Sequence, residues 1–182
     1  MEDVLIFCMS VLEILTDPHP LLHQPADEVV DFNEQLQELV NNMIHTLREK
    51  GFDGLGGLAA PQVGVLQQVF VLILPNQDPI IVVNPKVIST SGGTSKAWEY
   101  CYSVPGKRGR IRRHRKAIIE FQNQFGNKQK QEVADFVGRM YLHEIDHLGG
   151  ILWTDLIEGE GDVMTEAQWR EARARKRSGD KE

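Results

Sequence analysis

The sequence predicts an α+β domain, in which antiparallel sheets surround a central helix that carries the pattern His-Glu-x-x-His, between an N-terminal helix and a C-terminal helix. Three observations support this class: an early amphipathic helical pattern, β-type runs separated by turn residues, and a return of the helical period near residue 135. Helices and strands in separate stretches of a chain indicate α+β architecture. Because no repeat or long linker is present, we expect residues 1–182 to form one domain.

The first residues are interpreted as an extension. The apolar run from Val4 to Leu12 is about half as long as the ~20 residues that a membrane span requires. Glu2 and Asp3 lie where a signal peptide carries positive charge. We therefore expect neither a membrane span nor export, and Met9 as an alternative start leaves residues 1–8 as an N-terminal extension.

The first helix is predicted for Asp31–Lys50. Asp31 is suited to the N-cap because an acidic residue, Glu34, follows three positions later. Gly51 lies where a left-handed C-terminal cap belongs. Between these ends, apolar residues recur at helical spacing, namely Phe32, Leu36, Leu39, Val40, Met43, Ile44 and Leu47. This spacing predicts an amphipathic helix with one buried face.

The middle of the chain is predicted to be β-structure that begins with a Gly-rich loop, Gly54–Gly64. Short β-type runs that end at turn-forming residues then favour antiparallel strands. The expected elements are a strand at Val69–Leu74 ended by Pro75, a strand at Ile80–Val83 ended by Asn84-Pro85, a turn at Ser91-Gly92-Gly93, a segment at Trp98–Val104, and a strand at Ala117–Phe121 followed by a turn at Gly126-Asn127.

Two more helices are predicted in the last third of the chain. Asp135 is a suitable N-cap for the central helix, and Gly149-Gly150 should end it. The apolar residues between them follow a helical period. A C-terminal helix should begin after Thr165-Glu166, so that residues 165–182 form a basic helix or tail.

Composition and charge restrict the class of protein. Hydrophobic residues make up 41% and charged residues 25% of the chain, which is typical of a soluble globular domain. A formal net charge of -6 argues against a protein that coats nucleic acid with its whole surface. The two cysteines, Cys8 and Cys101, are too few for a disulfide-linked secreted scaffold. We therefore expect a cytoplasmic protein.

The pentapeptide His143-Glu144-Ile145-Asp146-His147 predicts a metal site. Residues four apart share one face of a helix, so both imidazoles can bind one metal ion while Glu144 reaches a water beside it. The alternative is an ordinary helix with two surface histidines. A catalytic site also requires a third ligand. Cys101 is the upstream candidate, and the downstream candidates, as in a zinc endopeptidase, are Glu158, Glu160, Glu166 and Glu171. The residue types alone leave both open.

The chain resembles the peptide deformylases in three motifs. The family patterns can be written Gly-φ-Gly-φ-Ala-Ala-Pro-Gln, Glu-Gly-Cys-φ-Ser and His-Glu-φ-Asp-His. This chain carries Leu55-Gly56-Gly57-Leu58-Ala59-Ala60-Pro61-Gln62, Glu99-Tyr100-Cys101-Tyr102-Ser103 and His143-Glu144-Ile145-Asp146-His147 in the same order. The likeness covers most of the chain, and the three motifs together are specific.

The resemblance implies a metal-dependent hydrolase that removes the N-formyl group from the initiator methionine of nascent polypeptides and releases formate. Cys101, His143 and His147 would hold one divalent metal ion per chain, with Glu144 as the acid and base. Fe²⁺ is expected in the cell, with Zn²⁺ or Ni²⁺ able to substitute; thiolate and imidazole ligands suit these ions better than Mg²⁺ or Ca²⁺.

The resemblance also implies a substrate groove around the metal. The Gln62 side chain and the Tyr102 backbone N–H would polarise the formyl oxygen. The implied peptide-binding residues are Gly56, Gly57, Tyr100, Arg108, Phe136 and Met140, with Arg108 on the peptide backbone and the last two at the methionine side chain.

Four residues depart from the family pattern along this groove: Leu55, Tyr100, Tyr102 and Arg139. Tyr100 and Tyr102 flank Cys101, and neighbours on either side of one residue share a face of an extended segment. We therefore expect their rings to lie together. Arg139 occupies an apolar position of the methionine pocket, and we expect it to point past the pocket to solvent.

Two basic clusters suggest a further partner. They are Lys107–Lys116, which has seven positive charges and no acid, and Arg170–Arg177 on the C-terminal helix. Such clusters form either a solvated surface or a contact with an anionic partner. The partner expected here is the ribosome, and a non-catalytic ribosome- or RNA-binding module with a structural metal is the remaining alternative to an enzyme.

Overall fold

The computed structural model describes residues 10–50 and 55–179. The proposed extension at residues 1–8, the expected cap at Gly51 and the start of the Gly-rich loop at Gly54 lie outside the described residues. The described elements, in chain order, are η1 (Pro20–His23), α1 (Glu34–Lys50), β1 (Gly56–Ala59), η2 (Ala60–Val63), β2 (Val69–Ile73), β3 (Ile80–Tyr100), β4 (Lys107–Gln122), β5 (Lys128–Ala134), α2 (Asp135–Leu148), η3 (Trp153–Leu156), η4 (Glu160–Asp162), β6 (Val163–Thr165) and α3 (Glu166–Gly179).

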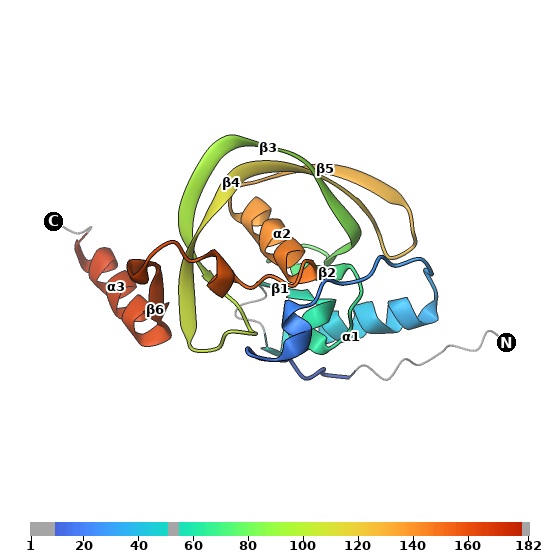
Figure 1. Ribbon diagram of the computed structural model, residues 1–182, viewed down its shortest axis with the longest axis horizontal. Helices are drawn as coiled ribbons and strands as arrows, with labels where there is room; N and C mark the ends of the chain where they lie inside the picture. Colours follow the sequence, from blue (N-terminus) through green and yellow to red (C-terminus); the bar gives the residue numbers. More distant parts are fainter. Residues whose placement is uncertain (1–9, 51–54, 180–182) are drawn as a thin grey trace.

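The strands form one antiparallel sheet in the order β1-β2-β3-β4-β5, and β6 pairs with β4 outside this path. In Figure 1, β3, β4 and β5 curve over α2, and α3 lies with β6 at the other end of the molecule from α1. The mixture of helices and antiparallel sheet confirms the α+β prediction. Within the described residues, however, the strands form one continuous sheet rather than several.

Strand β2 explains why α2 is buried. Side chains of a strand alternate between its two faces. Val69, Val71 and Ile73 pack with α1, whereas Phe70 and Leu72 pack with α2. Because helices cover both faces, the strand is apolar at every position. The helix with the two histidines is thereby held against the sheet.

The beginnings of α1 and α2 differ from prediction. Helix α1 begins at Glu34 rather than near Asp31, because the side chain of Asn33 accepts the backbone N–H of Leu36 at 3.1 Å. Helix α2 follows β5 directly, so Ala134 rather than Asp135 is its capping residue, and Asp135 has a φ of +51°. Two other predicted helix boundaries are confirmed: Gly149 directly follows α2, and α3 begins at Glu166.

Strand β3 passes through both places where the sequence predicted a break. The pairing of β3 with β4 shifts register between Val83 and Lys86 and again between Ser91 and Thr94. Residues at these shifts have positive φ: Asn84, Gly92 and Gly93. Turn-forming residues therefore mark β-bulges here, and bulges allow a strand to bend. This bending accompanies the curvature of β3 over α2 (Figure 1).

The predicted Gly-rich loop is also largely regular structure. Gly56–Ala59 forms β1, which pairs with β2, and Ala60–Val63 forms the short helix η2. The turn at Gly126-Asn127 is confirmed, since Gly126 has a φ of +82° between β4 and β5. Within the described ranges, no helix has the length and apolar character that crossing a membrane requires.

Candidate active site

The structure brings together the three predicted metal ligands. Cys101 directly follows β3, and His143 and His147 lie one turn apart on α2. Their ligand atoms all lie within 4.8 Å of one another, and the Cys101 Sγ is 3.3 Å from Nε2 of His147. All three side chains are buried. The arrangement therefore fits a single metal ion held by one sulfur and two nitrogen atoms.

Two further observations test this fit. Burial lowers the pKa of His147 well below its ordinary value, so this imidazole is neutral and can bind a metal. The buried atoms Glu144 Oε2 and His147 Nδ1 have no hydrogen-bond partner among the described residues. Buried polar atoms are usually paired, so the free Glu144 oxygen indicates a bound species beside it. A thiolate with two imidazoles suits Zn²⁺ or Fe²⁺.

Glu99, at the end of β3, orients the first histidine. Its Oε2 accepts the Nδ1–H of His143 at 2.8 Å, which leaves the Nε2 of that ring as the ligand atom. Burial alone would raise the pKa of Glu99, but hydrogen bonds from His143 and Arg113 hold it far below its ordinary value. Burial would likewise lower the pKa of His143, but hydrogen bonds to Cys101 and Glu99 raise it. Metal binding must therefore displace a proton from His143.

Two arginines compensate the charge of Glu99. Arg113 donates to both carboxylate oxygens at 2.6 and 2.9 Å and to Asp146 of the pentapeptide at 2.7 Å. Arg139 donates to Glu99 Oε1 at 2.8 Å and to the backbone oxygens of Ile111 and Ser95 at 2.9 and 2.8 Å. Arg139 is only 8% exposed, so the expectation that it points to solvent is wrong. A buried guanidinium requires these acceptors, and Glu99 supplies the balancing charge.

Replacing the carboxylate of Glu99 should destabilise the fold. The Glu99→Gln variant leaves Arg139 without its balancing charge, and removing one partner of a buried ion pair costs about 3 kcal/mol or more. Urea denaturation of the metal-free protein measures the loss. Glu132→Gln is the matched control, because Glu132 pairs with Lys116 at the surface, where an ion pair is worth about 1 kcal/mol at most. Equal losses in the two variants would show that the buried network does not stabilise the protein.

Glu144 and Gln62 have environments suited to proton transfer and hydrogen-bond donation. Burial raises the pKa of Glu144 to about 7, where a carboxyl group can both accept and return a proton. Gln62 is 1% exposed, and its Oε1 accepts the backbone N–H of Ala59 at 2.8 Å. This bond directs its Nε2 towards Ser103 Oγ at 3.1 Å and Cys101 Sγ at 3.5 Å. The amide donor therefore faces the metal ligands.

A cavity of about 670 Å³ adjoins the metal ligands. All of the predicted catalytic and substrate-binding residues line this cavity, namely Gly56, Gly57, Gln62, Tyr100, Tyr102, Arg108, Phe136, Met140 and Glu144. The metal ligands Cys101 and His143 also line it, whereas His147 is the one predicted site residue that does not. Five lining residues were not predicted to border the site, namely Pro75, Trp98, Glu99, Trp169 and Arg173. The last two come from α3, whose position depends on pairing between β6 and β4 that no local pattern indicates.

The two tyrosines beside Cys101 lie on the same side, as predicted. Their ring centroids are 5.5 Å apart at an interplanar angle of 82°, and both rings line the cavity. Tyr102 also packs against the hydrophobic core beneath α1. The aromatic side chains therefore form part of the cavity wall, while one of them also contributes to packing.

None of the four downstream acids joins the ligand cluster. Within the described part of the chain, the metal-ligand group consists of Cys101 and the two histidines. Glu158 pairs with Lys96 and Arg112, and Glu160 is exposed. Glu166 and Glu171 form ion pairs with Arg108 and Arg175, respectively. The structure therefore favours Cys101 over a downstream Glu as the third ligand.

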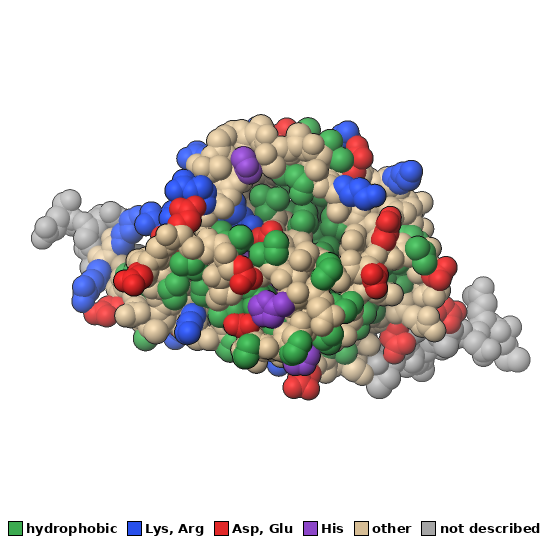
Figure 2. Space-filling model, in the orientation of Figure 1, with side chains coloured by type: hydrophobic (Ala, Val, Ile, Leu, Met, Phe, Trp, Pro, Cys, Tyr) green, Lys and Arg blue, Asp and Glu red, His purple; other side chains and the backbone are tan. Residues whose placement is uncertain are grey.

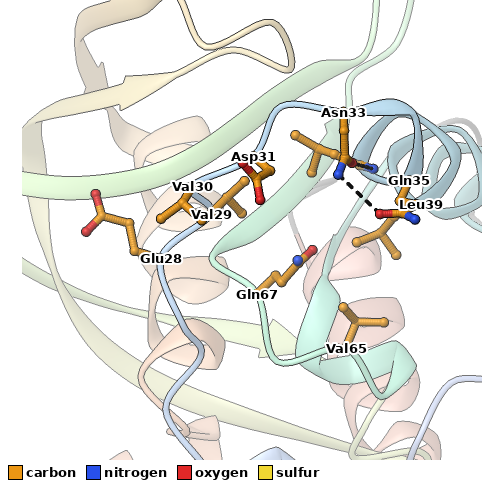
Figure 3. A pocket seen from close by; sticks show the side chains of 10 residues that line it. Glu28, Val29, Val30, Asp31, Asn33, Gln35, Leu39, Val65 and Gln67 are labelled. Atoms are coloured by element: carbon orange, nitrogen blue, oxygen red, sulfur yellow. Dashed lines mark hydrogen bonds between the residues drawn. The ribbon is translucent and has the colours of Figure 1, made fainter.

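A second cavity, of about 400 Å³, lies at the N-terminal end of α1 (Figure 3). The side chains of Asp31, Asn33 and Gln35 and the apolar Val65 border it, and Asn33 Nδ2 donates to Gln35 Oε1 at 3.1 Å. None of the predicted site residues is among those that line this cavity. The first cavity is therefore the candidate active site.

The buried helix with two histidines, the cysteine from the adjoining strand end and the adjacent glutamate define a metal-dependent hydrolase. Comparison with known proteins agrees. The sequence model of the polypeptide deformylase family matches residues 11–162. The chain is 33% identical over 172 residues to "Peptide deformylase 2" of a Nostoc species, covering 89% of this chain and 94% of the relative.

Solved structures give the same result. The crystal structure of peptide deformylase from Thermotoga maritima is 34% identical, with a TM-score of 0.77 over 82% of this chain and 99% of that chain. A Met-Ala-Ser-bound peptide deformylase from Acinetobacter baumannii is 26% identical, with a TM-score of 0.75 over 82% of this chain and 99% of that one. The protein described here belongs to the peptide deformylase family. It is accordingly a metal-dependent enzyme of the hydrolase class.

Proposed function

We propose that this chain releases formate from the N-formylmethionine at the start of nascent polypeptides, and that Cys101, His143 and His147 hold its one divalent metal ion. The observation that carries this proposal is the convergence of these ligands with Glu144 in one cavity. Fe²⁺ is proposed for the cell, with Zn²⁺ or Ni²⁺ able to substitute. When bound, such an ion supplies Lewis acidity, which lowers the pKa of water and polarises a carbonyl.

Glu144 moves the proton in this reaction. It accepts a proton from the attacking water and then gives it to the departing nitrogen. Burial, which raises the pKa of Glu144 to about 7 in the metal-free protein, makes the carboxylate basic enough for the first of these steps. Gln62 Nε2 and the backbone N–H of Tyr102 donate hydrogen bonds to the formyl oxygen as negative charge develops on it. Losing one such donor typically costs ~10²–10³ in rate.

The cavity positions the peptide. An extended substrate lies beside Gly56 and Gly57, where the absence of side chains permits close approach of two backbones. Its methionine side chain lies against Phe136 and Met140, and Arg108 contacts its backbone. The Met-Ala-Ser-bound relative supports the binding of a short peptide by this chain.

Formate release tests the proposed activity. The protein loaded with Fe²⁺ or Ni²⁺ should convert formyl-Met-Ala-Ser into Met-Ala-Ser and one equivalent of formate. A zinc endopeptidase would instead cut an internal peptide bond, and a binding module would release nothing. Either of those results, in protein with its metal bound, would contradict the proposal.

Gly57→Ala should abolish most of the activity. An added Cβ would clash with Glu144 Oε1 and would lie 2.7 Å from its Cδ, so the carboxylate must move. Misplacing a catalytic group by about 1 Å can lower the rate ~10²-fold. Measurement of kcat with formyl-Met-Ala-Ser tests this. Gly161→Ala is the control, because no atom lies within 4 Å of its added Cβ, and an unchanged kcat in Gly57→Ala would refute the assigned position of Glu144.

The ribosome is the proposed partner, and the cytoplasm the proposed location. Figure 2 shows Lys and Arg side chains gathered over the end of the molecule that α3 forms. In the Lys107–Lys116 cluster, Arg108, Arg112, Arg113 and Lys116 form ion pairs with acidic residues. On α3, Arg170 and Arg175 are also ion-paired, but their side chains are more exposed than those paired cations of β4. Their exposure supports a ribosome contact through α3 more strongly than through β4. Salt-sensitive cosedimentation with ribosomes would test it, and its absence at low salt would contradict it.

A further inference from the structure

The C-terminal helix forms one wall of the active-site cavity. Trp169 and Arg173 of α3 line the cavity together with Tyr100 of β3 and Arg108 of β4. Trp169 and Arg173 are four residues apart, so they share one face of the helix. In Figure 1, α3 lies beside β6, well away from α1 in the molecule.

This wall is held in place at its first turn. Strand β6 pairs with Lys107–Gly109 of β4, and the backbone N–H of Glu166 donates to the carbonyl oxygen of Gly106 at 2.9 Å. The Glu166 carboxylate also accepts hydrogen bonds from Arg108 at 2.7 and 3.3 Å. Backbone and side-chain bonds together therefore fix the start of α3 against the cavity.

The charges along the wall are unequally compensated. Arg108 is paired with Glu166 and stacks on Trp169, with its guanidinium carbon 3.7 Å from the ring centroid. Arg173 lies 5.0 Å from the same centroid and is exposed. Among the described residues, no carboxylate forms an ion pair with Arg173. Arg173 is therefore the cation on this wall whose charge remains available to a ligand.

We propose that Arg173, supported by the Trp169 ring, forms a subsite for an acidic side chain in the second or third residue of the formylated peptide. This inference rests on the proposed function, because the formylmethionine must lie at the metal ligands for later residues to lie along α3. An extended peptide advances about 3.3 Å per residue, which carries its next side chains along the cavity. A guanidinium binds a carboxylate through paired N–H donors.

The test compares peptides that differ in one charge. The pairs are formyl-Met-Glu-Ala with formyl-Met-Gln-Ala, and formyl-Met-Ala-Glu with formyl-Met-Ala-Gln. We expect the parent protein to favour the Glu peptide of at least one pair in kcat/KM by about two- to fivefold, the range of an exposed ion pair. The preference should lie in KM and should shrink at high salt.

Two variants assign the preference to Arg173. Arg173→Gln should abolish the preference. Arg173→Glu should reverse it, so that the Gln peptide of the same pair is favoured over the Glu peptide. Lys128→Gln removes an equal charge from β5, outside the cavity, and should keep the parental preference. The affinities of the deformylated products of both pairs, Met-Glu-Ala with Met-Gln-Ala and Met-Ala-Glu with Met-Ala-Gln, measured by calorimetry, should show the same order without any chemistry.

The outcomes separate the two proposals. Equal kcat/KM values for both peptide pairs in the parent, or a preference that survives in Arg173→Gln, would overturn the acidic subsite while leaving deformylation intact. Absence of formate release by the metal-loaded parent would refute the proposed function instead. In that event, equal calorimetric affinities of the products would overturn the subsite as well.

Discussion

Cys101→Ala should purify without its metal ion. The thiolate is one of three ligands, and two imidazoles alone leave a weak site that water enters. The zinc content measured by elemental analysis after loading with Zn²⁺ should fall from about one ion per chain to a small fraction of that. The fold should be retained, because alanine is nearly as small and as apolar as the buried cysteine that it replaces.

Cys8→Ala provides the matched control for this variant, since Cys8 is the other cysteine of the sequence. It should keep about one metal ion per chain. Full occupancy in Cys101→Ala would remove Cys101 from the ligand set and would favour a carboxylate from the downstream segment.

Glu144→Gln should keep the metal ion and lose nearly all turnover. The amide has the shape of the carboxylate but cannot accept the proton of the attacking water. General acid–base catalysis contributes ~10²–10⁴ in rate, so kcat should fall by that factor while KM changes little. Kinetics with formyl-Met-Ala-Ser measure the loss, and a decrease below tenfold would mean that another group is the base.

The same variant has a second readout in the metal-free protein. Burial raises the pKa of Glu144 from 4.5 to about 7, so the folded state holds this proton more tightly than the unfolded state. The stabilisation is complete below pH 4.5 and is lost as pH rises to about 7, which corresponds to about 3 kcal/mol. Relative to the parent, Glu144→Gln should therefore become more stable as pH rises through this window. An unchanged difference between the two proteins across the window would contradict the burial of this carboxyl group.

The metal site could be predicted because much of it is local in sequence. His143, Glu144 and His147 lie within five residues, and helical periodicity alone places them on one face of α2. Cys101 is distant in sequence, so residue chemistry left it in competition with downstream acids. The resemblance of the three motifs to a known family decided between these candidates, and the structure brings Cys101 to the histidines.

The parts that could not be predicted depend on pairing between distant segments. Asn84, Gly92 and Gly93 are typical turn residues, but pairing with β4 makes them bulges inside a long strand. Arg139 is buried because Glu99, forty residues earlier in the chain, accepts its hydrogen bond. Trp169 reaches the active site because three residues of β6 pair with β4. Local propensity contains no information about such contacts.

X-ray absorption spectroscopy of the Zn²⁺-loaded protein tests the proposed set of metal ligands, because it reports the atoms bound to the metal. Coordination by Cys101, His143 and His147 should give one sulfur at about 2.3 Å and two imidazole nitrogens at about 2.0–2.1 Å, with the remaining position filled by oxygen. A shell of nitrogen and oxygen without sulfur would contradict this ligand set.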